Sequence, residues 1–239
     1  MSARPAGGFA AAIAAENARA RLAVIPDIKC ISPKEGDLLR GRDPVAVARA
    51  LAACGAPVLS VVTEGARFGG SAALLDAIVR AVPVPVLRKD FITSAQQLQE
   101  TAALGAAAVL LICAITDQKN LQALYEKALT LGLQPLVEVH TAQEMALARQ
   151  LGAHLVGINN RDITAFELDD GGPARTAALI GSAPAGALLI SESGIGSPED
   201  AALAASCGAH AVLVGTALWQ AHDMAAMYQR LRVELCVPA

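Results

Sequence analysis

Charged and aromatic residues are scarce in this chain of 239 residues, and closely spaced cysteine pairs are missing. The five cysteines are scattered without a C-x-x-C pair, which argues against a disulfide framework or a zinc site and favours a reducing compartment. Charged residues make up 17% and the net charge is −3, so no overall field attracts nucleic acid. A hydrophobic content of 54%, much of it alanine, supplies a sizeable core and excludes disorder.

Segments that would export the chain or cross a membrane are also missing. Charged residues interrupt the first 23 residues, which therefore do not read as a signal peptide. Residues 201–221 carry no charge, but two glycines and a histidine divide them into a helix end, a short strand and a new turn. We expect a cytoplasmic protein without a membrane partner.

Eight short apolar runs alternate with alanine-rich stretches of helical character. Near-continuous apolar runs are typical of parallel strands that are covered on both faces. Eight alternations, spaced by about 20–35 residues, predict an α/β fold, a closed (β/α)₈ TIM barrel. The alternative, an open doubly wound sheet, usually carries a G-x-G-x-x-G turn after its first strand, which this chain lacks. The predicted strands are 24–29, 58–63, 84–89, 107–113, 135–140, 155–160, 188–193 and 211–216.

Glycines and capping side chains mark the predicted ends and starts of the helices. A Gly-Ala or Gly-Leu pair precedes five of the strands, and a glycine in the left-handed conformation commonly ends a helix. These glycines are Gly55, Gly105, Gly132, Gly152 and Gly208. Side chains that can cap a helix start are Asp43, Ser94, Asp117 and Ser197.

The whole chain, residues 1–239, is predicted to form one barrel domain. Residues 1–23 precede the first strand and form an extension with a helix over residues 9–21. This helix would cap the bottom of the barrel or flank its mouth, and a frayed tail is the alternative.

Charged and amide side chains gather where the predicted strands end. Side chains two residues apart on a strand share a face, so Asp27 and Lys29 point the same way. The same holds for Asn159 and Arg161 if that strand continues far enough. Pointing inward at the carboxyl end of a barrel, such side chains meet around a cavity. The candidates are Asp27, Lys29, Lys89, Glu138, Asn159, Arg161 and Glu192.

Two interpretations of this set stay open. The side chains could form an ion-pair network that only fills the barrel. They could instead form an active site, because acid–base chemistry needs neighbouring charges that push pKa values apart. Their common position at the catalytic end of the barrel favours the active site.

The last two strands each end in a glycine next to a hydroxyl residue, Ser193-Gly194 and Gly215-Thr216. Glycine lets backbone N–H groups approach phosphate oxygens, and a following helix start adds positive potential. Because phosphate often binds between these two loops in such barrels, we predict a phosphate site there. Two tight turns are the alternative.

Other reactive side chains are not taken as functional candidates. The four histidines, His140 among them, form no pattern of metal ligands. Cys30 alternates away from the face of Lys29 and is interpreted as a packed thiol, with a nucleophile as the alternative. Trp219 and Tyr125 lie in helical stretches and are interpreted as packing residues.

With these residues the chain resembles the indole-3-glycerol phosphate synthases of tryptophan biosynthesis. The similar segments follow in the same order between residues 24 and 216, and LRKDF together with INNRD is the most specific combination. The segments are 27–33 (DIKCISP), 60–64 (SVVTE), 68–71 (FGGS), 87–91 (LRKDF), 136–140 (LVEVH), 157–162 (GINNRD), 191–195 (SESGI) and 213–216 (LVGT).

The resemblance implies ring closure, decarboxylation and dehydration of 1-(2-carboxyphenylamino)-1-deoxyribulose 5-phosphate, without a cofactor or a metal. The implied catalytic residues are Lys89, the general acid; Lys29 and Asp27, a pair for substrate binding and dehydration; the carboxylate Glu138; and Asn159 and Glu192, which position the substrate and the lysines. The implied binding residues are Arg161, which positions substrate; Ser32 for the anthranilate carboxylate; Phe68, Phe91 and Leu110 for the aromatic ring; and Ser193, Gly194, Gly215 and Thr216 for phosphate.

The chain departs from the family pattern at several positions. The family has Glu where this chain has Asp27, commonly has Arg at Cys30 and Asn at Gly69, and has a longer segment before the first strand. These departures leave two alternatives: a diverged barrel enzyme for another phosphorylated substrate, and a barrel subunit without turnover. Retention of Lys89 and Glu138 argues against the second. A monomer and a homodimer both stay open.

Overall fold

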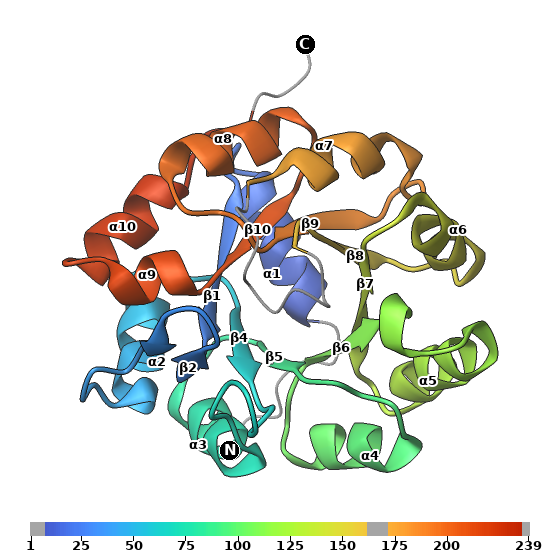
Figure 1. Cartoon of the computed structure of the whole chain (residues 1–239), viewed down its shortest axis with the longest axis horizontal. Coiled ribbons are helices and arrows are strands. Elements are labelled where there is room, and N and C mark those ends of the chain that lie inside the picture. Colours follow the sequence, from blue (N-terminus) through green and yellow to red (C-terminus); the bar gives the residue numbers. More distant parts are fainter. Residues whose placement is uncertain (1–7, 162–171, 236–239) are drawn as a thin grey trace.

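Eight parallel strands form a closed barrel at the centre of the molecule, as the repeated apolar runs predict. The computed structural model describes residues 8–161 and 172–235. Figure 1 looks along the barrel, which β1 and β4 close by pairing in the register Asp27 to Ser60. The strands of the barrel are β1 Ala23–Ile28, β4 Leu59–Val62, β5 Val86–Lys89, β6 Ala108–Ile112, β7 Gln134–Val139, β8 Leu155–Asn159, β9 Leu188–Glu192 and β10 Ala211–Val214.

All eight predicted strands are present, but their ends differ from the prediction by one or two residues. Lys29 directly follows β1, Ser193 directly follows β9, and Thr216 begins a helix. The apolar pattern does not fix these ends, because pairing with the neighbouring strand decides them. A short hairpin of β2 Ile31–Ser32 and β3 Gly36–Asp37 was not predicted.

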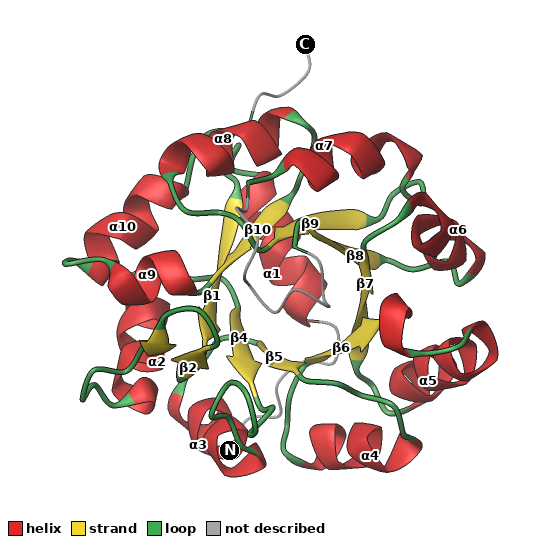
Figure 2. Cartoon of the chain, viewed as in Figure 1, coloured by secondary structure: helices red, strands yellow, loops and turns green. Residues whose placement is uncertain are grey.

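Helices surround the barrel, and Figure 2 shows them as an outer ring. They are α2 Pro44–Ala53, α3 Ala72–Ala81, α4 Ala95–Ala103, α5 Gln118–Thr130, α6 Ala142–Gln150, α7 Ala174–Leu179, α8 Pro198–Ser206, α9 Thr216–Gln220 and α10 Met224–Leu231, with the 3₁₀ helices η1 Cys113–Ile115 and η2 Ile180–Ser182.

The predicted N-caps and helix-ending glycines are confirmed. Asp43, Ser94, Asp117 and Ser197 are N-caps whose side chains accept hydrogen bonds from backbone N–H groups of the first turn. The five predicted helix-ending glycines have φ between 63° and 103°, a left-handed conformation that a side chain would strain. Local sequence therefore sets where most helices start and stop.

Helix α1, Gly8–Asn17, closes the bottom of the barrel. Phe9 and Ile13 are fully buried against the apolar side chains of the barrel interior. Gln134, at the start of β7, accepts a hydrogen bond from the backbone of α1 at 3.0 Å. In Figure 1 the helix lies within the outline of the strand ring. The helix is shorter than predicted, and the left-handed residue Ala20 turns the chain toward β1.

Four cysteines, Cys30, Cys54, Cys113 and Cys207, are unpaired. Cys236 and Asp162 lie outside the described residues. Within the described parts of the chain, no helix has both the length and the apolar character needed to cross a bilayer.

Candidate active site

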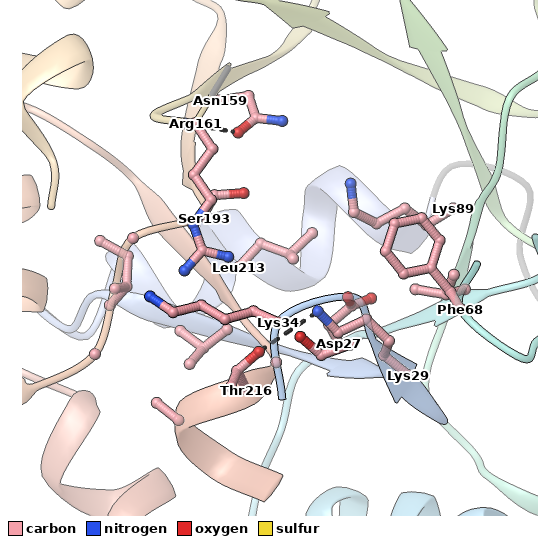
Figure 3. Close-up of a pocket in the computed structure, with 18 of the residues that line it drawn as sticks. Asp27, Lys29, Lys34, Phe68, Lys89, Asn159, Arg161, Ser193, Leu213 and Thr216 are labelled. Atoms are coloured by element: carbon pink, nitrogen blue, oxygen red, sulfur yellow. Dashed lines mark hydrogen bonds between the residues drawn. The ribbon is translucent and has the colours of Figure 1, made fainter. Parts of the chain in front are cut away.

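A cavity of about 810 Å³ opens at the carboxyl ends of the barrel strands. Figure 3 shows its lining, with Lys89, Phe68 and Asp27 on one side and Asn159, Arg161 and Ser193 across from them. Glu192 does not line the cavity and is fully buried. The other predicted site residues all line it: Asp27, Lys29, Ser32, Phe68, Lys89, Phe91, Leu110, Glu138, Asn159, Arg161, Ser193, Gly194, Gly215 and Thr216.

Lys89, the last residue of β5, lies between two buried carboxylates. Its Nζ is 3.5 Å from Oε2 of Glu138 and 3.4 Å from Oε2 of Glu192. Burial alone lowers the pKa of Lys89, but the negative charges of Glu138, Glu192 and Asp27 outweigh burial and raise the pKa above its usual value. Lys89 therefore carries a proton at neutral pH.

The side chain of Glu192 occupies space in the barrel interior that is open because Gly157 on β8 has no side chain. A Cβ atom at Gly157 would overlap Oε1 of Glu192, so a glycine is needed at this point of the strand. Burial raises the pKa of Glu192, although the charge of Lys89 opposes this shift. The carboxyl group can therefore hold a proton under conditions in which an exposed glutamate is ionised.

Two hydrogen bonds hold Asp27 at the end of β1. Its Oδ1 accepts a hydrogen bond of 2.6 Å from Ser60 Oγ, and its carbonyl accepts one of 2.9 Å from Trp219 Nε1. A Cβ atom at Gly215 would lie 3.4 Å from the Cβ of Asp27, so this glycine packs against the acid. Trp219, which the sequence suggested only as a packing residue, also fixes the backbone of β1.

Lys29 joins the predicted phosphate side of the cavity to its aromatic wall. Its Nζ lies 3.4 Å from Thr216 Oγ1, the contact drawn in Figure 3. The same Nζ lies 5.7 Å from the centre of the Phe68 ring, within the range of a cation–π interaction. Lys29 therefore faces both parts of any ligand that fills the cavity.

The loop after β9 turns sharply at Ser193 and Gly194, whose φ angles are 62° and 69°. Such a conformation is uncommon for a residue with a side chain and is typical of functional sites. Asn160 supports this loop, because its Nδ2 donates hydrogen bonds to the carbonyls of Glu192 at 2.9 Å and Ser193 at 3.1 Å.

Strand β8 ends at Asn159, so the predicted common strand face of Asn159 and Arg161 does not apply. Both side chains line the cavity nevertheless, because the chain turns after the strand and Arg161 N donates to Asn159 Oδ1 at 3.1 Å. Arg175 on α7 holds this turn through hydrogen bonds of 2.8 and 2.6 Å to the carbonyls of Asn159 and Arg161.

Several residues of the site were not predicted from the sequence. Lys34 lines the cavity from the turn between β2 and β3, and Ser60 and Asn160 bind site residues from neighbouring strand ends. His140, of which the sequence analysis said only that it belongs to no metal-ligand pattern, has its Nε2 3.5 Å from Oε1 of Glu138. In the predicted strand 135–140, His140 shares a face with Glu138, and this was the available signal, although β7 itself ends at Val139.

Comparison with known proteins supports one family. The family model described as indole-3-glycerol phosphate synthase matches residues 1–231. The chain is 44% identical to the indole-3-glycerol phosphate synthase of Pyrococcus furiosus over 207 residues, which cover 87% of this chain and 90% of the relative. It is 47% identical to that of Parafrankia sp. over 197 residues, which cover 82% and 72%. It is 43% identical to indole-3-glycerol phosphate synthase 1 of Streptomyces coelicolor over 221 residues, which cover 92% and 80%.

Proposed function

The chain belongs to the indole-3-glycerol phosphate synthase family, and from this membership we propose how its own residues carry out the family's reaction. The substrate is 1-(2-carboxyphenylamino)-1-deoxyribulose 5-phosphate. The aromatic carbon that bears the carboxylate attacks the ribulose carbonyl, CO₂ leaves that carbon, and the new hydroxyl leaves with a proton as water. The products are indole-3-glycerol phosphate, CO₂ and water.

The position of Lys89 between Glu138 and Glu192 carries this proposal. A carbonyl oxygen becomes strongly basic as the aromatic carbon attacks it, and it needs a positioned proton donor. Lys89 faces the cavity and keeps its proton because Glu138, 3.5 Å from its Nζ, raises its pKa most strongly, with Glu192 at 3.4 Å on the other side. Lys89 protonates the carbonyl oxygen, and the partly water-excluded barrel strengthens the interaction.

Dehydration is assigned to Lys29 and Asp27. Lys29 donates a proton to the departing hydroxyl, and Asp27 accepts the proton that is released when the ring double bond forms. Both side chains face the cavity from the end of β1. Because Ser60 and Trp219 hold Asp27, its carboxylate keeps one position during the reaction.

The remaining lining residues bind the substrate. Ser32 holds the anthranilate carboxylate, and Asn159 and Arg161 position the ribulose chain. The aromatic ring packs among Phe68, Phe91 and Leu110. The phosphate binds at the loops after β9 and β10, to Ser193, Gly194, Gly215 and Thr216. The cavity lining thus suits a substrate with an aromatic ring at one end and a phosphate at the other.

The test is turnover of the carboxyphenylamino-ribulose phosphate by the purified protein, together with growth of a tryptophan auxotroph that lacks the synthase. We expect indole-3-glycerol phosphate to form and growth to be restored. A well-folded protein that binds phosphate but forms no product would contradict the proposal and favour a diverged barrel enzyme.

We also propose that the protein acts in the cytoplasm as a monomer or homodimer, without nucleic acid or a membrane. The small phosphorylated substrate is then its partner. Cell fractionation and size-exclusion chromatography with light scattering test both statements, and recovery with membranes or with nucleic acid would contradict them.

A further inference from the structure

His140 lies just past the end of β7, between two carboxylates. Its Nε2 is 3.5 Å from Oε1 of Glu138, and its Nδ1 is 3.4 Å from Oε2 of Glu144 on α6. The backbone N–H of His140 also donates a hydrogen bond of 2.5 Å to Glu144 Oε2. The His140 side chain is 8% exposed and does not line the cavity, so it touches the site only from behind.

The two oxygens of Glu138 therefore have different neighbours. Oε2 faces Lys89 at 3.5 Å, whereas Oε1 faces the imidazole of His140 at 3.5 Å. Glu138 is 1% exposed, so water does not replace either contact. Since a carboxylate rotates as a unit, the contact at Oε1 decides how Oε2 is presented to Lys89.

The surroundings of His140 favour the ionised form of Glu144, on the Nδ1 side of the ring. Burial raises the pKa of Glu144, but the nearby ring of His140 and the hydrogen bond from the His140 backbone N–H outweigh burial and hold the pKa below its usual value. On the neighbouring 3₁₀ helix η1, burial, Glu144 and Glu138 raise the pKa of Cys113 to about 12, so its thiol stays neutral. A ring nitrogen that carries a proton donates to a carboxylate, and both can do so only in the doubly protonated ring.

We propose that His140 is a positioning residue for the reaction proposed above: its Nε2–H orients the carboxylate of Glu138 beside Lys89, while Glu144 holds the ring through Nδ1. The arrangement is that of a base oriented by a third group, here applied to a carboxylate. The inference rests on the proposed function, because Glu138 acts there. A histidine that serves only packing would have no preference for a donor at Nε2.

Four proteins form the core of the test: the parent, H140F, E138Q and the double variant H140F/E138Q. Misplacement of a reacting group by about 1 Å can cost on the order of 10²-fold in rate. We expect H140F to lower kcat by roughly 10- to 100-fold with little change in KM, since His140 does not line the cavity. Because His140 acts through Glu138, the double variant should be no slower than E138Q.

Two further variants separate positioning from folding. In H140Q, the amide Nε2–H can still donate to Glu138, so this variant should recover most of the activity that H140F loses. Replacement of the exposed His154, at the opposite end of the barrel, by Phe is the matched control and should keep the parent kcat. Thermal unfolding is measured for every variant.

The outcomes separate this inference from the proposed function. A parent protein without turnover overturns both. A parent that turns over, with H140F within threefold of it, overturns only the role of His140. Additive losses in the double variant, or equal losses in H140Q and H140F, also overturn that role and leave a packing residue. A loss in H140F that H140Q rescues and that disappears in the E138Q background supports it.

Discussion

The carboxylates next to Lys89 set its protonation state, and the cavity gives a ligand access to its amino group. The proposed general acid therefore depends on three side chains, which come from β5, β7 and β9. A lysine in an apolar cavity would lose its proton, because burial disfavours the charged form. The negative charge of Glu138 contributes most to reversing that effect, and Glu192 adds to it when it is ionised, so a buried lysine is suited to the proposed role of proton donor.

Replacing Lys89 by Met keeps the length of the side chain and removes its proton. We expect kcat to fall by about 10²–10⁴-fold, the usual contribution of a general acid, while KM changes little. Steady-state turnover measures this effect. Replacement of the exposed Lys119 on α5 by Met is the control and should match the parent. A Lys89→Met protein within threefold of the parent rate would remove Lys89 from the mechanism.

Asp27 is the clearest departure from the family pattern, and the structure favours tolerance of the longer acid. Its Ser60 partner lies in a segment that matches the family, so the site is built to receive a carboxylate at this point. We expect Asp27→Glu to keep or raise turnover, because an added methylene moves the carboxylate toward the lysines. Asp27→Asn keeps the shape without the charge and should lose at least about 10²-fold. Equal losses in both variants would show that the site has been reshaped around the shorter acid.

Most residues of the candidate site could be predicted from charged residues at the ends of apolar strands. An acid or a lysine at the end of an apolar strand has to face inward or be paired, and Asp27, Lys89 and Glu138 follow that rule. Arg88 shows its limit: it lies next to Lys89 but faces outward, where it pairs with Asp90 at 3.1 Å and Glu100 at 2.6 Å. The contacts of Ser60 and His140 were not predictable, because they depend on which strand ends become neighbours.

Strand β8 contributes two residues to the site: Asn159, which lines the cavity, and Gly157, which leaves space for a neighbouring side chain. Its Gly157 pairs with Ile190 on β9, and the side chain of Glu192, two residues farther along β9, occupies the space that a Cβ atom at Gly157 would need. An isolated glycine within an apolar strand run signals a close approach, but the sequence does not say which group approaches.

Gly157→Ala should displace Glu192 and disturb Lys89 in turn. Overpacking of a filled interior costs about 1–3 kcal/mol, so we expect a lower free energy of unfolding by that amount together with a large loss of kcat. Denaturant unfolding and turnover measure the two effects. Gly181→Ala is the control, because a Cβ atom there meets nothing within 4 Å and the residue lies outside the barrel. Parent-like behaviour of Gly157→Ala would mean that Glu192 has room to move.

At the scale of the whole molecule, the buried Glu192 ties stability to pH. Its pKa is raised by burial, so the folded protein binds this proton more tightly than the unfolded chain does. The contribution is complete below the usual pKa of 4.5 and is lost as the pH rises toward the raised value. Folding therefore becomes less favourable through Glu192 as the pH rises.

Glu192→Gln cannot lose a proton at this position. We expect the free energy of unfolding of the variant to rise relative to that of the parent between about pH 5 and pH 8, with the difference smallest at the acidic end. Urea unfolding at several pH values measures this difference. A difference that stays constant over the range would mean that Glu192 ionises in the fold as readily as in the unfolded chain.

The barrel itself was predictable, because eight apolar runs with helix caps between them leave few alternatives. The position of α1 was not predictable. An alanine-rich helix with Phe9 and Ile13 can pack against either end of a barrel, and the sequence left both ends open. A hydrogen bond joins the backbone of α1 to Gln134, more than a hundred residues away, at the bottom of the barrel. The local sequence of α1 does not indicate this partner.

The closed bottom has a consequence for substrate entry and product release. Among the described residues, α1 packs below the strands and apolar side chains fill the interior above it, so the route to Lys89 runs through the cavity at the carboxyl ends of the strands. Carbon dioxide, being small and uncharged, can escape around a bound product. If the phosphate binds at the loops after β9 and β10 as proposed, the product has to leave these loops before the next substrate can bind. Substrate entry and product release would then be sequential, and the product would compete with the substrate for the same site.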